Sequence, residues 1–214
     1  IHLLSKYVSS DGKAPKLNKL NDGHFKKAKQ KVKNQVEDIA DDLIKLYSER
    51  SQLKGFAFSA DDEDQHAFDD AFPYVETDDQ LRSVEEIKRD MQASQPMDRL
   101  LVGDVGFGKT EVAMRAAFKA VNDHKQVVVL VPTTVLAQQH YTNFKERFQN
   151  FAVNIDVLSR FRSKKEQTET LEKLKNGQVD ILIGTHRVLS KDVVFSDLGL
   201  MIIDEEQRFG VKHK

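Results

Sequence analysis

The chain has 214 residues, with 33 Lys and Arg against 34 Asp and Glu, a formal net charge of −1, and 39% hydrophobic residues. This composition is typical of a globular protein and excludes the disordered and fibrous classes. No apolar run approaches the ~18–20 residues needed to cross a bilayer, so we expect no membrane partner. The chain has no cysteine, which excludes disulfides and cysteine-based metal sites and fits a cytoplasmic location.

The charge is distributed unevenly over three regions. Residues 1–55 carry a net charge of +5, residues 56–98 carry −10 and residues 99–214 carry +4. The chain begins at Ile1 without a methionine or a leader, and we therefore expect a piece of a longer protein. Within the first region, we interpret residues 1–20 as the remnant of an upstream module.

A long helix is predicted over residues 21–55. Apolar residues recur every three or four positions from Phe25 to Leu46, with Asp22 as a plausible N-cap and Gly55 as a plausible end. The first half of this helix is basic and the second half acidic, which opposes the helix macrodipole. Two interpretations stay open: a solvated face, or a docking surface for another domain or a partner.

Residues 56–71 are acidic, with six carboxylates between Asp61 and Asp70 and few apolar residues. Repulsion among the carboxylates predicts an extended or mobile connector.

From Arg99 onward, apolar runs alternate with helical patterns. The expected strands cover residues 100–102, 127–131, 153–158, 179–183 and 199–203. The expected helices lie near residues 109–122, 134–148, 163–176 and 185–190. This alternation predicts an α/β fold with a mainly parallel sheet that helices cover on both faces.

A phosphate-binding motif follows the first of these expected strands. Residues 103–110 read GDVGFGKT and match G-x4-G-K-T before a predicted helix. The glycines allow backbone N–H groups to surround a phosphate, Lys109 should reach the β- and γ-phosphates of ATP, and Thr110 should bind Mg²⁺. The candidate nucleotide-binding residues in this stretch are Gly103, Asp104, Gly106, Phe107, Gly108, Lys109, Thr110 and Glu111.

An acidic motif follows the last expected strand. Residues 204–207 read DEEQ directly after the apolar run Leu200–Ile203, at the sheet edge where nucleotide chemistry occurs in open parallel sheets. We expect Asp204 to hold Mg²⁺ through water and Glu205 to act as general base. The candidate catalytic residues are Lys109, Asp204, Glu205 and Gln207.

Upstream of the phosphate loop, Thr77 and Gln80 have the spacing of a capping box before a helical pattern. In a second interpretation, Gln80 hydrogen-bonds the adenine edge while Phe72 or Tyr74 packs nearby. Both interpretations stay open on the residues alone.

Candidate nucleic-acid contacts lie on turns at the same sheet edge. Hydroxyl groups and helix N-termini suit phosphates, although plain N-capping would also explain the threonines. The segment Ser159–Lys165 adds four cations and one aromatic residue. The candidates are Thr133, Thr134, Gln138, Arg160, Arg162, Thr185 and His186.

Taken together, these motifs show that residues 72–214 resemble the first RecA-like lobe of a superfamily 2 helicase or translocase. The strings GDVGFGKTEVAMRAAF, LVPTTVLAQQHY, SRFRS, DILIGTHRVL and DEEQRFGVKHK are similar to the bacterial transcription-repair coupling factor family. The fork-regressing, branch-migrating helicases share only part of this set. The long helix also resembles the linker between polymerase-binding module and motor in the coupling factors.

This resemblance implies an ATP-driven double-stranded DNA translocase that displaces stalled RNA polymerase and recruits excision-repair proteins. Polymerase would be contacted mainly through a missing upstream module, and repair proteins through regions outside this chain. The resemblance implies that Gln80 senses adenine. It also implies that a set of residues faces DNA, namely Thr133, Gln138, Arg160, Thr185 and His186. Gln207 stands where the family usually has His, which puts the coupling between ATP and DNA in question.

The resemblance also implies that a second lobe with its arginine finger is missing, so we expect this chain alone to hydrolyse little ATP. Two other functions stay open: the motor lobe of a fork-regressing helicase, and a non-catalytic docking element that uses the charged helix.

Overall fold

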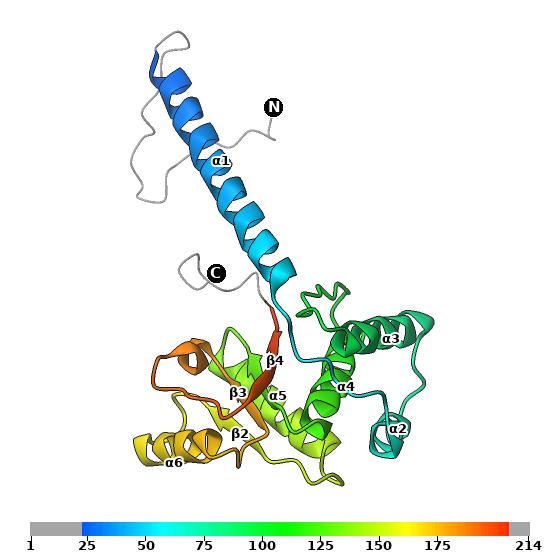
Figure 1. The fold of residues 1–214 in the computed structure, drawn as a ribbon. Helices are drawn as coiled ribbons and strands as arrows, with labels where there is room; N and C mark the ends of the chain where they lie inside the picture. Colours follow the sequence, from blue (N-terminus) through cyan, green and yellow to red (C-terminus); the bar gives the residue numbers. More distant parts are fainter. Residues whose placement is uncertain (1–22, 206–214) are drawn as a thin grey trace, which may run out of the picture. The chain divides into compact units, whose positions relative to one another are not determined.

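The computed structural model describes residues 23–205 (Figure 1). The predicted N-cap Asp22, the upstream remnant and Gln207 lie outside this range. The described part of the chain divides into two compact units, one that ends at Leu53 and one that begins at Lys54. None of the helices in the described range is long and apolar enough to cross a membrane.

The first unit contains helix α1 (Gly23–Gln52), which has 30 residues and is about 45 Å long. A helix therefore forms over most of the predicted range and ends three residues before Gly55. Its apolar stripe includes Val36 and Leu43, which are 58% and 47% exposed. On the polar side, Lys33 and Glu37 form an exposed ion pair at 3.5 Å.

The second unit has the α/β fold that the sequence predicts. Its four strands are β1 (Gln126–Leu130), β2 (Ile155–Leu158), β3 (Ile181–Gly184) and β4 (Leu198–Ile203). All pairings are parallel, and the strand order is β2-β3-β1-β4. The sheet is built through crossover connections, which the alternation of apolar runs and helical patterns predicts.

Helices cover both faces of the sheet. The helices of the second unit after its acidic segment are α3 (Asp78–Gln92), α4 (Lys109–Asn122), α5 (Thr134–Arg147), α6 (Lys164–Lys175) and the 3-10 helix η1 (His186–Leu189). Val127 and Val129 of β1 belong to the larger core with α3, α4 and α5. Val128 and Leu130 belong to a smaller core with Leu174 of α6 and Val188 of η1. Because successive side chains of a strand point to opposite faces of the sheet, β1 contributes to the cores on both faces.

The predicted strand at residues 100–102 is wrong. These residues form no strand, and the side chains of Leu100 and Val102 are 78% and 81% exposed. Only Leu101 packs against the larger core. An apolar run of three residues does not show whether a neighbouring strand is available for pairing. In the described range β4 is the last strand at its edge of the sheet, and residues 100–102 do not pair with it.

The acidic segment differs from the predicted extended connector. It forms helix α2 (Glu63–Asp70), which Asp62 caps by accepting a hydrogen bond from the Gln65 amide. Glu63 in the first turn has a favourable charge for a helix N-terminus. The fully buried Phe68 stacks on Phe118 of α4 with ring centroids 4.3 Å apart, which anchors the segment to the lobe.

Lysines of α3 and α4 neutralise two of the carboxylates of this segment, Asp61 and Asp69. Lys88 binds Asp61 at 2.6 Å and Asp69 at 2.5 Å, and Lys119 binds Asp61 at 2.7 Å. The local pattern of charges could not show this pairing, because the lysines lie 19 to 58 positions away from their partners along the sequence. We call residues 56–76, held in this way, the acidic clasp.

Candidate nucleotide site and nucleic-acid groove

The candidate site residues gather at one edge of the sheet. Leu130, Leu158, Gly184 and Ile203 end the four parallel strands in matching register. The turns that follow them contain the candidate threonines, arginines and carboxylates of the sequence analysis. The fold therefore brings together residues that are up to about 70 positions apart in the chain.

The phosphate loop has the backbone geometry that its glycines predict. Gly106 and Gly108 have φ angles of +86° and +72°, in the left-handed region that favours glycine. Helix α4 starts at Lys109 with Gly108 as N-cap, and no side chain caps its first amides. An uncapped helix N-terminus that follows a glycine-rich turn suits an anionic phosphate.

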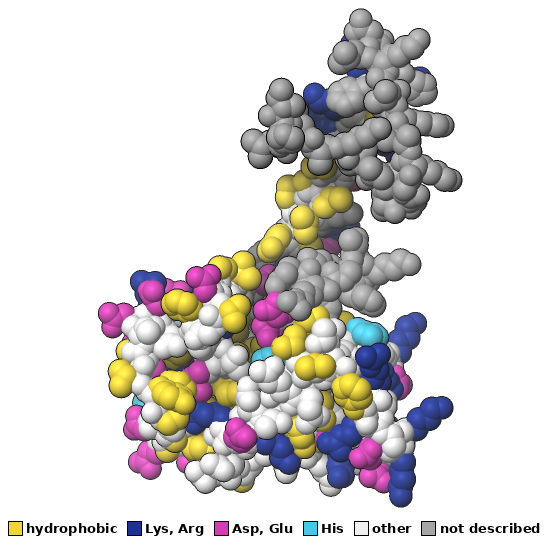
Figure 2. Space-filling model, turned by 180° about the vertical axis from the view of Figure 1, so that it is seen from behind, with side chains coloured by type: hydrophobic (Ala, Val, Ile, Leu, Met, Phe, Trp, Pro, Cys, Tyr) yellow, Lys and Arg dark blue, Asp and Glu magenta, His cyan; other side chains and the backbone are white. Residues whose placement is uncertain are grey.

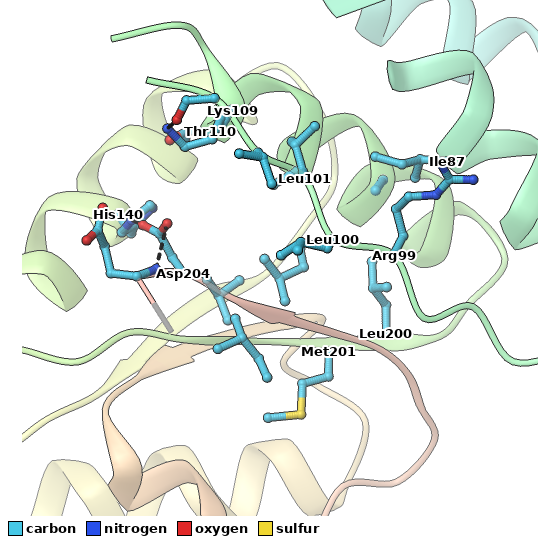
Figure 3. A pocket seen from close by; sticks show the side chains of 18 of the residues that line it. Ile87, Arg99, Leu100, Leu101, Lys109, Thr110, His140, Leu200, Met201 and Asp204 are labelled. Carbon is cyan, nitrogen blue, oxygen red and sulfur yellow. Dashed lines mark hydrogen bonds and ion pairs between the residues drawn. The ribbon is translucent and has the colours of Figure 1, made fainter. Parts of the chain in front are cut away.

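Lys109, Thr110 and Asp204 line one cavity of about 640 Å³ (Figure 3). The ammonium group of Lys109 donates to the carbonyl oxygens of Gly103 at 2.6 Å and Asp104 at 2.8 Å. It is also close enough to Asp204 to contribute to lowering the pKa of that carboxyl. The lysine thus bridges its own loop and can exchange these bonds for phosphate oxygens.

Asp204 is held by two hydrogen bonds. His140 Nε2 lies 2.8 Å from Asp204 Oδ2, and the Glu205 amide donates to Oδ1 at 3.0 Å. The hydrogen bond from His140 lowers the pKa of Asp204, and burial opposes it. Glu205 has a φ of +53°, an uncommon conformation for a residue with a side chain.

The residues of this cavity fit a magnesium–nucleotide complex. The Thr110 hydroxyl and the Asp204 carboxylate are hard oxygen ligands that line the same cavity. In residues 23–205 there is no cluster of three or more His, Cys, Asp or Glu that could hold a metal alone. That donor set matches Mg²⁺, which binds through one or two protein oxygens together with phosphates and water.

Gln80 forms the predicted capping box and also contacts the phosphate loop. Its Oε1 accepts from the Thr77 amide at 2.8 Å, and its own backbone amide donates to the Thr77 hydroxyl oxygen at 3.3 Å. Its Nε2 donates to the backbone oxygen of Phe107 at 3.0 Å. Both ends of the side chain are therefore engaged, and the adenine contact stays a prediction.

Two other predicted nucleotide residues point into a buried charged network. The Glu111 carboxylate binds Arg115 at 3.0 Å and Arg147 at 2.8 Å, which joins α4 to α5. The guanidinium groups of Arg115 and Arg147 lie 5.4 Å and 5.7 Å from the centre of the Phe72 ring. In this structure the Glu111 carboxylate and the Phe72 ring therefore contact the two arginines between α4 and α5.

A second cavity, of about 440 Å³, lies between the turns after β1, β2 and β3. We call it the edge groove. Lys and Arg side chains gather on the side of the lobe that carries α6 (Figure 2). The residues that line the groove are Pro132, Thr133, Thr134, Arg160, Gln167, Thr185, His186 and Arg187.

The edge groove includes five of the seven predicted nucleic-acid contacts. The other two are Arg162 and Gln138. Arg162 is paired with Glu166 at 3.3 Å and with Asp156 at 3.6 Å, which neutralises much of its charge. Thr133 does cap α5, accepting from the Leu136 amide at 3.2 Å, so its capping role is real and its phosphate role stays a prediction.

Sequence reasoning missed His140 and Arg147. His140 lies on the buried face of α5 with Ala137 and Phe144, and its partner Asp204 is 64 positions away. Arg147 donates to Glu111 across 36 positions. A polar residue at an apolar-face position of a predicted helix was the available signal, but it does not identify a partner.

Comparison with known proteins defines the class. Residues 77–214 match the DEAD/DEAH box helicase family, and the chain belongs to this family. Within it, the chain is 66% identical over all 214 residues to the transcription-repair-coupling factor of Bacillus subtilis (strain 168). It is 59% identical over 211 residues to the transcription-repair-coupling factor of Staphylococcus aureus (strain NCTC 8325 / PS 47). These matches confirm the resemblance drawn from the motifs.

The chain spans 18% of the length of each of these two relatives. A solved structure of RecG bound to a three-way DNA junction superimposes with a TM-score of 0.72 and 38% sequence identity. That match covers 78% of this chain and 23% of the RecG chain, and it confirms the RecA-like fold class.

Proposed function

We propose that residues 72–214 form the ATP-binding motor lobe of an ATP-dependent double-stranded DNA translocase. The observation that carries this proposal is the single cavity that Lys109, Thr110 and Asp204 share. Following the relatives' name, the whole protein would displace stalled RNA polymerase and couple transcription to nucleotide excision repair in the cytoplasm. Polymerase and repair proteins would bind mainly outside this chain.

In the proposed site, the loop amides and the Lys109 ammonium bind the β- and γ-phosphates. Thr110 and Asp204 hold Mg²⁺, which when bound neutralises charge on the phosphates. Glu205 accepts a proton from the attacking water as general base. Gln80 positions the loop through Phe107 and reads the adenine edge by exchanging one of its present bonds.

The edge groove is proposed to bind the phosphates of duplex DNA. It combines the guanidinium of Arg160 with the hydroxyls of Thr133 and Thr185 at the start of α5 and η1. Cations and backbone amides at helix N-termini are the groups that bind DNA phosphates without reading sequence.

The nucleotide site can be tested with Lys109→Ala in the 214-residue chain. We expect this variant to lose at least tenfold in affinity for a fluorescent ATP analogue, because the Lys109 ammonium is the cation of the phosphate loop in this cavity. Lys191→Ala is the matched control, since Lys191 is exposed and outside the cavity. Unchanged affinity in the Lys109 variant would refute the nucleotide site.

A docking element is the alternative from another class. It predicts that reversing the charges of the basic half of α1 abolishes partner binding while Lys109→Ala does not. The residues to reverse are Lys26, Lys27, Lys29, Lys31 and Lys33. A motor lobe predicts that Lys109→Ala lowers nucleotide affinity and that reversing the charges of α1 does not.

A fork-regressing helicase is the second motor function, which the likeness to junction-bound RecG favours. Titration of the chain with forked and linear duplexes of equal length separates the two motors. A preference for the fork above tenfold supports the helicase, and equal affinity supports the translocase.

We also infer that the 214-residue chain alone turns over ATP slowly. In phosphoryl transfer, an arginine from a second lobe contributes about 10³–10⁵ in rate. Robust DNA-stimulated turnover by this chain would overturn the inference.

A further inference from the structure

The carboxylate of Asp204 is oriented by a side chain from outside the DEEQ motif. The backbone of Asp204 is fixed because its amide donates to Leu130 of β1 at 2.9 Å. Its Oδ1 is held by the neighbouring Glu205 amide, and its Oδ2 by His140 Nε2 at 2.8 Å. Among the described side chains, His140 is the one that hydrogen-bonds the Asp204 carboxylate and so fixes its orientation.

His140 is an unfavourable choice for packing alone. It is 8% exposed on the inward face of α5, next to Phe144, and its Nδ1 is buried without a hydrogen-bond partner in the described part of the chain. An unpartnered buried nitrogen is destabilising, so an apolar side chain would pack better there. Because an ionised carboxylate only accepts, Nε2 must carry the hydrogen that it donates to Asp204.

The same helix reaches the edge groove. Helix α5 begins at Thr134, which lines that groove with Thr133, and His140 lies six residues further, about 9 Å along the axis. A packed helix moves as a rigid element, so a small shift of its first turn is carried to His140.

We propose that His140 is a positioning residue that orients Asp204 for Mg²⁺ and links the state of the edge groove to the nucleotide cavity. The proposal rests on the proposed role of Asp204 as the carboxylate that holds Mg²⁺. Hydrogen-bonding partners of metal ligands typically contribute 10- to 100-fold to metal affinity. Through His140, the binding of a polyanion such as duplex DNA in the groove would change the affinity of the nucleotide cavity for Mg²⁺.

The test measures how strongly Mg²⁺ increases affinity for a fluorescent ATP analogue, as the ratio of dissociation constants in EDTA and in Mg²⁺. His140→Leu is expected to lower this ratio about tenfold, which corresponds to about 1.4 kcal/mol. His140→Gln, whose amide can replace the Nε2 donor, is expected to stay within threefold of the unchanged chain. Phe148→Leu loosens the aromatic packing at the end of α5, outside the cavity, and is expected to leave the ratio unchanged.

Asp204→Asn separates the two levels of the proposal. If Asp204→Asn lowers the ratio and His140→Leu does not, the positioning role is wrong while the Mg²⁺ site stands. If Asp204→Asn leaves the ratio unchanged, the proposed site itself fails. If His140→Leu does not fold, His140→Gln and the spectroscopic measurement below decide.

A spectroscopic measurement on the unaltered sequence tests the link to the groove. In a chain labelled with ¹⁵N-histidine, the signal that disappears in His140→Gln belongs to His140. Its Nε2 resonance is expected to shift when Mg²⁺ and ADP are added, and again when a duplex oligonucleotide is added without nucleotide. No shift with Mg²⁺ and ADP overturns the positioning role, and no shift with the oligonucleotide overturns the link.

Discussion

Lys119 of α4 donates to the Asp61 carboxylate at 2.7 Å and is itself only 3% exposed in its side chain. The same ammonium donates to the Ser59 backbone oxygen at 2.6 Å. These contacts fix the acidic clasp to the helix that starts at the phosphate loop. A segment of high negative charge is thus an integral part of the motor lobe.

The first prediction concerns this ion pair. Asp61→Asn leaves Lys119 buried beside a neutral partner, and we expect it to lower the free energy of unfolding by about 2–3 kcal/mol. Urea denaturation measures the change. Asp64→Asn is the control, because Asp64 is exposed and lies three residues further on, in the first turn of α2. Equal stability of the two variants would show that the Asp61 contact contributes nothing.

The second prediction is a loss of stability in acid. Burial acts to raise the pKa of Asp61, but hydrogen bonds from Lys119 and Lys88 outweigh it and lower that pKa below its ordinary 3.8. The hydrogen bond from Arg115 lowers the pKa of Glu76 below its ordinary 4.5. Carboxylates with lowered pKa values contribute stability that is complete above the ordinary values and is lost as the pH falls through the lowered ones.

Unfolding measured between pH 6 and pH 3 should therefore show stability falling below about pH 4.5. Asp61→Asn should show a shallower fall, because one of the carboxylates with a lowered pKa is gone. The prediction fails if both proteins lose stability with the same slope.

The third prediction concerns Gly108. Alanine there would need a left-handed backbone, and its Cβ would lie 2.2 Å from Gln80 Nε2. We expect Gly108→Ala to cost about 1–2 kcal/mol in stability and to weaken nucleotide binding. Gly103→Ala is the matched control in the same loop, since its Cβ would meet Lys109 at an ordinary 3.6 Å. Calorimetry and nucleotide titration measure both effects, and equal behaviour of the variants would contradict the prediction.

The fourth prediction concerns the edge groove. Arg160 is exposed and lines the groove, whereas Arg162 is paired with Asp156 and Glu166. Arg160→Ala should weaken duplex binding and reduce the slope of log affinity against log salt by about 1, as the loss of one phosphate contact does. Arg162→Ala should change the slope less. A larger effect at Arg162 would place the DNA elsewhere on the lobe.

The sequence by itself determined the family and the fold class, and it named most residues of the candidate site. The alternation of apolar runs with helical patterns predicted a parallel sheet, and β1 to β4 lie within two residues of the expected ranges. The phosphate loop and the carboxylates after β4 could be placed because the motif and its flanking elements are local in the sequence.

Tertiary structure decided what depends on partners distant in the chain. The run Leu100–Val102 has strand residues but no strand pairing, the acidic clasp folds because distant lysines neutralise it, and Glu111 binds Arg147. His140 acquires its place beside Asp204 only when α5 packs on the sheet. Local patterns report periodicity and turn chemistry, whereas ion pairing and burial depend on which segments the fold brings together.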